Sequence, residues 1–312
     1  MRKSLPCILA VAAAFLLQIS LTAQPIKETY TFAVKGQDEL LLDRIYDPAK
    51  AGDGLMPTMI YMYGGGFAFG NRGGNFSYLT DIGVQVISIE YRKLLTATGY
   101  APVATEVMDK AQSTAQEDLT DAIAFALKHA EEWKIDTEKV MFSGSSAGAI
   151  CTLMEIYDIC NEGCHSKKLP SGFMPAGYIA YAGVIRNHEQ ALTWKKKPCP
   201  MMFFHGSKDT TLPIHSHISD EVSVFGPQYI VGQLKEMEVP YWLYIEDEAD
   251  HVMSYKPFSG YSTAEIQTFI KKFVIMELPL QMETHEKNMV EPASLANHGR
   301  PAKRKQEPLA DS

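Results

Sequence analysis

A serine stands at the centre of the pentapeptide Gly144-Ser145-Ser146-Ala147-Gly148, which has the G-x-S-x-G pattern of a nucleophile elbow. The pentapeptide follows a short apolar run, 139–142, and precedes a segment, 147–159, whose apolar residues recur at helical spacing. A strand that turns at once into a helix brings backbones close together, which explains glycines on both sides of the serine. We therefore expect Ser146 at the tip of a sharp turn, although the pentapeptide alone is equally compatible with an ordinary strand-to-helix turn.

A serine hydroxyl becomes a nucleophile when a base accepts its proton and an acid holds that base in the right tautomer. On a strand-turn-helix scaffold of this kind, the acid and then a histidine follow the serine along the chain. Two apolar, strand-like runs after Ser146 lead to suitable side chains: 201–205 leads to Asp209, and 241–246 leads to His251. The carboxyl ends of parallel strands meet at the edge of a sheet where active sites form. We predict Asp209 as the acid and His251 as the base.

Other side chains near these positions stay as alternatives. The alternative acids are the carboxylates close to His251 and one more distant carboxylate: Asp247, Glu248, Asp250 and Asp220. Carboxylates so near His251 along the loop are less suited to reach its Nδ1 atom. His205 precedes a tight turn, so we expect it to have a structural role in the loop of Asp209. The histidines at positions 215 and 217 lie two residues apart in a polar stretch, which is weak evidence for a metal pair.

Three consecutive glycines follow the apolar run 58–62, in the stretch Tyr63-Gly64-Gly65-Gly66-Phe67. Backbone amides in such a loop can donate hydrogen bonds to an oxyanion, and glycine lets the backbone approach the substrate closely. Losing one such donor raises a barrier by roughly 2.7–4 kcal/mol. A phosphate-binding loop would need a Lys-Ser/Thr ending or a G-x-G-x-x-G spacing, and this stretch has neither. The glycines therefore predict an oxyanion hole.

The elements that would position these residues alternate along the chain. Strand-like runs lie at 28–35, 40–46, 58–63, 84–91, 140–143, 178–184, 201–205 and 241–246, and helix-like segments at 75–81, 115–133, 147–159, 228–237 and 263–276. Strands and helices alternate from the third strand onward, which predicts a mostly parallel, eight-stranded α/β sheet with helices on both faces. A Gly36-Gln37-Asp38 turn separates the first two runs, which indicates an antiparallel hairpin.

Length and composition favour one catalytic domain, at residues 24–277, because 46% of the 312 residues are hydrophobic and no repeat or long linker is visible. Residues 1–23 carry Arg2, Lys3 and an apolar run from about position 6 to 21, which is typical of a secretory signal peptide. We therefore expect a secreted or periplasmic protein without a stable membrane span after cleavage, and an uncleaved anchor is the alternative. Residues 278–312 contain few aliphatic residues and a basic cluster, which predicts a flexible tail.

Charge and cysteine content limit the partners. The net charge of −8 argues against nucleic acid as a ligand. Removing the leader would leave an even number of cysteines, which permits disulfides in an oxidising compartment: Cys151, Cys160, Cys164 and Cys199. A metal site at the close pair 160 and 164 would need a second pair with matching spacing, which is missing. We expect neither a metal nor a cofactor.

The glycine loop, the elbow, the stretch Gly206-Ser207-Lys208-Asp209 and the stretch Ala249-Asp250-His251 occur in an order that resembles the α/β-hydrolase fold. More narrowly, residues 27–276 resemble the carboxylesterases with a triple-glycine oxyanion loop, including the hormone-sensitive-lipase-like, feruloyl-esterase-like and type-B branches. The resemblance implies Ser146 as nucleophile, Asp209 as acid, His251 as base, and an oxyanion hole made by the amides of Gly65, Gly66 and Ala147.

The chain mixes features of these branches. The branch whose acid is Asp usually has His before the three glycines, where this chain has Tyr63 as type-B carboxylesterases do. Type-B enzymes commonly have Glu at the position of Ser145 and use Glu as the acid. The resemblance implies a serine carboxylesterase without a cofactor that acts on small-molecule or polysaccharide-linked esters. Together with the predicted signal peptide, it favours an exported enzyme and esters of plant polysaccharides such as acetyl or feruloyl groups. The alternatives are a serine peptidase and a catalytically inert binding protein on the same fold.

The segment 93–114 lies between a predicted strand and a predicted helix and contains several apolar residues. Loops at the carboxyl edge of a sheet often shape the substrate pocket. These residues either form a pocket wall or pack on the body of the domain. For Phe67 and Phe69 two placements are likewise open: they either flank the pocket or anchor the glycine loop.

Overall fold

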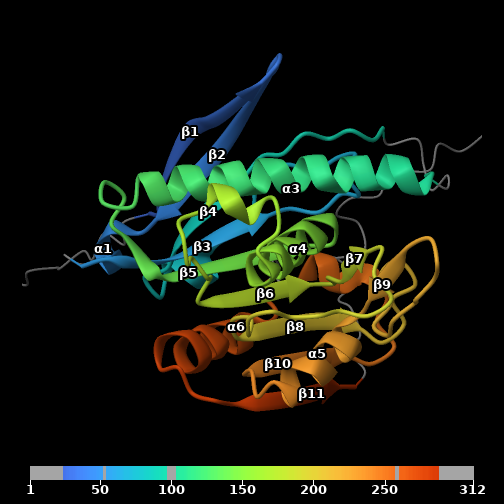
Figure 1. Cartoon of the computed structure of the whole chain (residues 1–312). Helices are drawn as coiled ribbons and strands as arrows, with labels where there is room; N and C mark the ends of the chain where they lie inside the picture. Colours follow the sequence, from blue (N-terminus) through green and yellow to red (C-terminus); the bar gives the residue numbers. More distant parts are fainter. Residues whose placement is uncertain (1–23, 52–53, 97–102, 257–259, 288–312) are drawn as a thin grey trace, which may run out of the picture.

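A nine-stranded sheet forms the centre of the computed structural model, which describes residues 24–51, 54–96, 103–256 and 260–287 (Figure 1). The strand order is β1-β2-β4-β3-β5-β6-β8-β10-β11, and every neighbouring pair from β4 to β11 is parallel. The strands are β1 (Ile26–Lys35), β2 (Asp38–Tyr46), β3 (Met56–Met62), β4 (Gln85–Ile89), β5 (Ile135–Ser145), β6 (Gly177–Tyr181), β8 (Met201–Gly206), β10 (Tyr241–Glu246) and β11 (Gln281–Glu286). The predicted α/β class with a mostly parallel sheet is confirmed.

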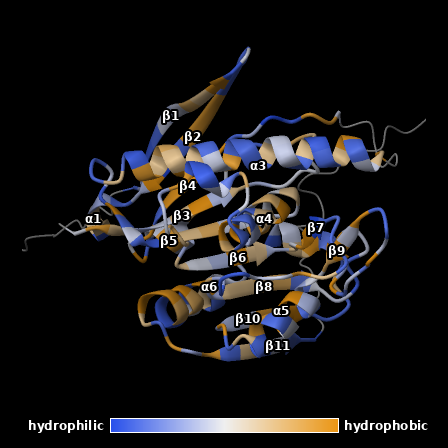
Figure 2. Cartoon of the chain, viewed as in Figure 1, coloured by the Kyte–Doolittle hydropathy of each residue, from blue (hydrophilic) through white to orange (hydrophobic). Residues whose placement is uncertain are grey.

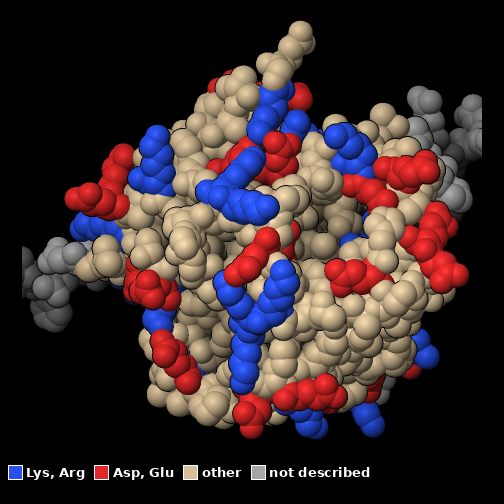
Figure 3. Space-filling model, in the orientation of Figure 1, with Lys and Arg blue, Asp and Glu red and all other residues tan. Residues whose placement is uncertain are grey.

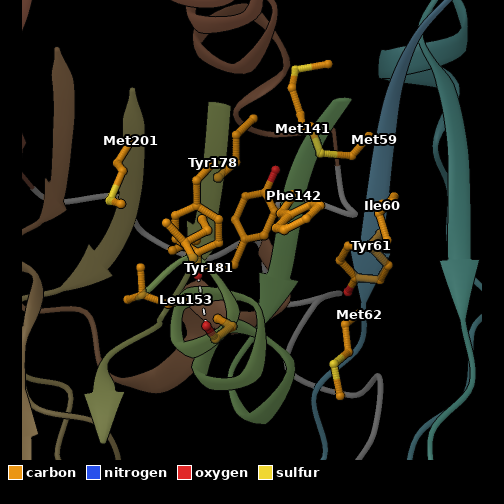
Figure 4. Close-up of a cluster of buried hydrophobic side chains, with 14 of the residues drawn as sticks. Met59, Ile60, Tyr61, Met62, Met141, Phe142, Leu153, Tyr178, Tyr181 and Met201 are labelled. Carbon is orange, nitrogen blue, oxygen red and sulfur yellow. Dashed lines mark hydrogen bonds between the residues drawn. The ribbon is translucent and has the colours of Figure 1, made fainter. Parts of the chain in front are cut away.

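Helices connect most of the parallel strands. They are α1 (Pro48–Ala51), α2 (Ser77–Thr80), α3 (Thr105–Lys128), α4 (Ala147–Asn161), α5 (Pro227–Glu236) and α6 (Thr263–Phe269), which continues as a π-helical turn (Ile270–Ile275). Two short 3₁₀-helices, η1 (Ser166–Lys168) and η2 (His251–Ser254), lie in the loops. The helices α4 and α6 lie on opposite faces of the sheet (Figure 4), and Gln267 of α6 donates a hydrogen bond to the Tyr78 carbonyl of α2.

The predicted hairpin at the start of the domain is confirmed. β1 and β2 pair antiparallel, with Lys35 opposite Asp38 across the turn. The hairpin projects beyond the rest of the sheet at the top of Figure 1. β2 then pairs antiparallel with β4, which joins the hairpin to the parallel strands.

The long helix α3 is amphipathic (Figure 2). Its buried alanines and leucine recur every three or four residues, at Ala111, Ala115, Leu119, Ala122 and Ala126, which is the spacing of one helix face. The helix begins ten residues before the predicted start at 115. Its first turns carry little buried apolar surface, so the pattern that indicates a helix is absent there.

The core lies between the central strands and the helices. Figure 4 shows side chains of β3, β5, β6 and α4 in one cluster, among them Tyr61, Phe142, Tyr178 and Leu153. Residues 140–145 of β5 are all buried, because this central strand is covered on both faces. The strand that carries the elbow is therefore held rigidly in the middle of the sheet.

Two expectations about the strands need correction. The sheet has nine strands instead of eight, because β11 adds parallel to β10 at the edge. The catalytic domain therefore does not end at 277, and residues 281–286 are part of the sheet instead of a flexible tail. A two-stranded ribbon, β7 (Ile185–Asn187) with β9 (Ser223–Phe225), was also not expected. The rest of the predicted tail, 288–312, and the predicted signal peptide, 1–23, lie outside the described residues.

Acidic and basic side chains are interspersed on the face of the molecule shown in Figure 3. Several ion pairs join α3 to its neighbours: Asp121 contacts Lys35 of β1 and Lys168 of η1, each at 2.6 Å, and Glu117 contacts Arg92 at 2.8 Å. These pairs fasten the outer face of α3 to the hairpin and to two loops.

The four cysteines of the described chain are free thiols, and three of them are buried. Among helices of the described residues, none has the length and hydrophobicity needed to cross a membrane.

Candidate active site

The turn between β5 and α4 places Ser146 in a strained conformation, with φ of +49° and ψ of −118°. A non-glycine residue with positive φ is uncommon and is held there by its surroundings. A Cβ atom on Gly148 would lie 2.1 Å from the Met62 carbonyl oxygen, and one on Gly144 would lie 2.5 Å from the Gly148 carbonyl carbon. The two outer glycines are thus required by close backbone approach, as the sequence predicts for a nucleophile elbow.

The structure brings Ser146, His251 and Asp209 together. The Ser146 Oγ atom lies 2.8 Å from His251 Nε2, and His251 Nδ1 lies 2.7 Å from Asp209 Oδ2. The three residues come from three elements: Ser146 from the β5–α4 turn, Asp209 from the loop after β8, and His251 from η2 after β10. The carboxyl ends of parallel strands meet at this edge, which is the placement that the sequence predicts.

Asp209 is held by several donors. Its Oδ1 atom accepts hydrogen bonds from the backbone amides of Thr211 and Leu212, each at 2.9 Å. Burial by itself would raise the pKa of the Asp209 carboxyl, but the hydrogen bonds from His251 and from the Leu212 amide lower it below its ordinary value. The carboxylate is therefore ionised at neutral pH and fixed to accept the Nδ1 proton of His251.

The alternative acids make other contacts. Asp250 Oδ1 accepts the amide of Val252 at 3.0 Å and so caps η2 at its start. Asp247 lies 3.5 Å from His285 Nδ1, on the side of β11. Neither carboxylate is the one that contacts His251 Nδ1.

His205 is completely buried, as expected for a structural residue. Its Nε2 atom donates to the Leu212 carbonyl at 2.8 Å and lies 3.6 Å from Asp209 Oδ2. Burial lowers the pKa of this histidine, which favours the neutral form. His205 therefore holds the turn that presents Asp209.

The glycine loop lies directly against the elbow. A Cβ atom on Gly64 would be 2.8 Å from the Ser145 carbonyl oxygen and 3.0 Å from Ser146 Cβ. Gly65 then turns with φ of +116°, and its carbonyl accepts the amides of Ala68 and Phe69. Ala147 is the first residue of α4, and the amides of the first helical turn have no intrahelical acceptor. The amides of Gly65, Gly66 and Ala147 thus belong to two segments that meet beside Ser146.

Tyr63 and three residues that the sequence analysis did not single out, Glu90, Tyr91 and Lys93, hold the glycine loop. The Tyr63 hydroxyl donates to Glu90 at 2.5 Å, and Lys93 Nζ lies 2.8 Å from the same carboxylate and 3.2 Å from the Gly70 carbonyl. Burial, followed by the bond to Glu90, raises the pKa of Tyr63. Tyr91 donates to the Gly64 carbonyl at 3.2 Å. The charged pair Glu90 and Lys93, three residues apart after β4, is the sequence signal that could have suggested these contacts.

The apolar residues near the site divide into two groups. Phe67 is buried with its ring edge-on to Tyr91, whereas the side chain of Phe69 is 62% exposed. In the segment 93–114, Leu95 packs on the core and its amide donates to the Phe67 carbonyl, whereas Leu94 is exposed. Phe67 therefore anchors the loop, whereas Phe69 and Leu94 are exposed on the surface. Residues 97–102 of this segment lie outside the described chain.

Two surface hollows lie away from these residues. One, of about 380 Å³, is lined by residues of β1 and α3, and the other, of about 360 Å³, includes Lys139, Cys199 and Phe273. Neither hollow includes Ser146, Asp209 or His251, so neither belongs to the site described above.

Comparisons with known proteins agree with this architecture. Residues 42–162, which include the glycine loop and the elbow, match the BD-FAE family model. No curated protein matches the chain. One similar structure is a thermophilic esterase, Est2, from the Planctomycetes species Thermogutta terrifontis. It has a TM-score of 0.56 and 16% identity, and the match covers 81% of this chain and 93% of that one. Another is MGS-M1, an α/β hydrolase from a Medee basin deep-sea metagenome library, with a TM-score of 0.51 and 17% identity over 80% of this chain and 95% of that one. With the strand order and the elbow described above, these likenesses show that the chain has the α/β-hydrolase fold.

Proposed function

We propose that the protein is a serine carboxylesterase that hydrolyses carboxylic esters through an acyl-Ser146 intermediate. The observation that carries the proposal is the continuous chain of contacts from Ser146 Oγ to His251 Nε2 and from His251 Nδ1 to Asp209, at 2.8 and 2.7 Å. This is the arrangement of nucleophile, base and acid in a Ser-His-Asp triad.

In the acylation step, His251 Nε2 accepts the Ser146 hydroxyl proton while Oγ attacks the ester carbonyl carbon. Negative charge then develops on the carbonyl oxygen, where the amides of Gly65, Gly66 and Ala147 donate hydrogen bonds. His251 returns the proton to the leaving alcohol oxygen as the ester C–O bond breaks. The ionised Asp209 carboxylate stabilises the imidazolium that forms between these two proton transfers.

In the deacylation step, water takes the place of the alcohol. His251 accepts a proton from the water as its oxygen attacks the acyl carbon of acyl-Ser146. When the tetrahedral intermediate collapses, the bond to Ser146 Oγ breaks and Oγ regains the proton from His251. The product is a carboxylic acid, and the enzyme returns to its starting state.

Properties of the similar structures support the reaction class. Esterase 2 of T. terrifontis has been solved with propionate bound, with butyrate bound, and phosphorylated by paraoxon. Organophosphates of this kind are reagents for activated serine hydroxyls. The proposal extends this reactivity to Ser146.

We extend the proposal to location and substrate. The leader-like residues 1–23 support export, and an exported enzyme meets polymeric substrates outside the cell. The resemblance to feruloyl-esterase-like enzymes supports acetyl or feruloyl esters of plant polysaccharides as substrates. The exposed Phe69 and Leu94 beside the glycine loop are suited to contact an apolar acyl group.

The proposal is tested with nitrophenyl esters of increasing chain length, methyl ferulate, acetylated xylan and a peptide amide. We expect ester hydrolysis by the wild-type protein, loss of about 10⁶-fold in kcat in Ser146→Ala, and mass spectrometric detection of one paraoxon adduct on Ser146. Ser77→Ala, at an exposed serine of α2, is the matched control and should react like wild type. Cleavage of the amide alone would favour the peptidase, and an absence of both hydrolysis and labelling would favour an inert binding scaffold.

A further inference from the structure

Ser145, the residue before the nucleophile, has a contact that the proposed mechanism does not use. Its side chain is only 5% exposed, and its hydroxyl donates a hydrogen bond to the backbone carbonyl of Ser254. Ser254 is the last residue of η2, the short helix that begins with His251. One hydroxyl therefore joins the strand that carries the nucleophile to the helix that carries the base.

The same side chain lies against the other catalytic segment. The position of a Cβ atom on Gly64 would be 3.2 Å from Ser145 Oγ, so the glycine loop passes directly over this hydroxyl. The Ser145 hydroxyl also contacts Tyr61 of β3. Burial raises the pKa of Tyr61, and the hydrogen bond with Ser145 partly opposes this rise. Ser145 thus lies where the elbow, the glycine loop and η2 meet.

Among the described residues, the other contacts that hold η2 include the hydrogen bond from His251 to Asp209 and the packing of Met253 in the core. η2 has four residues, of which only Met253 is buried, and the His251 side chain is 23% exposed. Asp250 caps its start from within the same loop, so that contact does not fix η2 relative to the elbow. At the far end, the buried ammonium of Lys256 contacts both carboxylate oxygens of Glu246, which closes the loop on its own strand.

We infer that Ser145 is a positioning residue that sets the distance between His251 Nε2 and Ser146 Oγ by holding the Ser254 carbonyl. The inference rests on the proposed function for its effect on turnover. Loss of the hydroxyl frees η2 to move relative to the elbow, and displacement of a catalytic group by about 1 Å can cost about 10²-fold in rate.

The contact also explains why this chain has serine at a position where type-B carboxylesterases commonly have glutamate. The partner at position 254 is a carbonyl oxygen, which only accepts hydrogen bonds. An ionised glutamate also only accepts, so it would repel that carbonyl, and its longer side chain would meet the glycine loop. A small donor is the side chain that this junction needs.

The test compares Ser145→Ala and Ser145→Cys with wild type. We expect kcat to fall roughly 10- to 100-fold in Ser145→Ala, with KM changed less than about twofold, because the residue does not touch the substrate. Ser145→Cys, a weaker donor of similar shape, should give an intermediate kcat. The matched control is Thr58→Val, which removes another buried hydroxyl that donates to a backbone carbonyl, that of Met56 at 3.1 Å, and should keep the wild-type kcat.

A second measurement does not depend on turnover. The proton between His251 Nδ1 and Asp209 gives a downfield proton resonance, which should be sharp in wild type and Thr58→Val and broadened by solvent exchange in Ser145→Ala. A kcat and a resonance like those of wild type in both position 145 variants would overturn the inference. If wild type hydrolyses no ester and is not labelled, the proposed function fails, and the resonance still decides whether Ser145 positions His251.

Discussion

At the scale of single residues, the structure separates two aspartates that lie near His251. Asp209 contacts His251 Nδ1 at 2.7 Å, whereas Asp250 accepts the amide of Val252. We expect Asp209→Asn to lower kcat about 10⁴-fold, because an amide favours the wrong imidazole tautomer. Asp250→Asn keeps an acceptor for the cap and should lower kcat less than about 10-fold.

Steady-state kinetics on the nitrophenyl ester that wild type cleaves fastest would measure both effects, with thermal unfolding to show that each variant is folded. Equal losses in the two variants would contradict the assignment of Asp209 as the acid. A larger loss in Asp250→Asn would identify Asp250 instead of Asp209 as the acid.

The sequence predicts the reacting residues better than the residues that hold them. Ser146, Asp209 and His251 each follow a strand in a recognisable order, so their positions relative to the sheet edge follow from topology. The contact of Ser145 with Ser254 joins residues 109 positions apart, and that of Tyr63 with Glu90 joins residues 27 apart. Neither pair forms a motif, because such contacts depend on how loops of different strands pack together.

At the scale of helices, the interface of α3 and α4 contains a buried acid. Glu155 of α4 is fully buried and accepts hydrogen bonds from Gln116 and Thr120 of α3, while its second carboxylate oxygen has no hydrogen-bond partner among the described residues. Burial raises its pKa from 4.5 to about 7. The folded state therefore holds this proton more tightly than the unfolded chain does.

The pKa of Glu155 makes stability depend on pH. The contribution of its protonated form is complete below pH 4.5 and is lost as the pH rises to about 7, at a total cost of about 3 kcal/mol. We expect Glu155→Gln, which stays neutral, to be more stable than wild type at pH 8 and similar at pH 5, as measured by urea unfolding. Glu131→Gln, at an exposed glutamate after α3, is the control and should show no such difference. A constant offset between pH 5 and 8 would contradict the assignment.

Helices and strands were predictable where their buried faces are regular. The strands of the central sheet are apolar and buried on both faces, so their presence follows from sequence. The first six residues of α3, 105–110, and all of β11 contain no buried residue, and Gln281, Glu283 and His285 are exposed. The start of α3 forms because it continues a helix whose later turns are buried. β11 forms because the edge of β10 would otherwise have unpaired backbone groups.

At the scale of the whole molecule, β11 closes one edge of the sheet. All six residues of β10 are buried, and β11 pairs with each of them, from Tyr241 with Gln281 to Glu246 with Glu286. The Trp242 indole also donates to the Thr284 hydroxyl at 2.9 Å. Without β11, the backbone groups of a buried apolar strand would form an exposed edge, which promotes association between chains.

A chain that ends at Leu280 should therefore be less stable than the full chain, whereas one that ends at Lys287 should not. Loss of a six-residue strand removes several hydrogen bonds worth about 0.5–1.5 kcal/mol each, so we expect Tm to fall by roughly 10 °C or more. Residues 288–312 contain few aliphatic side chains that could add to the core, so we expect the chain that ends at Lys287 to keep the Tm of the full chain. Differential scanning calorimetry measures both, and sedimentation velocity should show self-association of the shorter chain alone. Equal Tm values for the two truncated chains would mean that β11 does not contribute to the stability of the sheet, and the domain would then end near residue 277 after all.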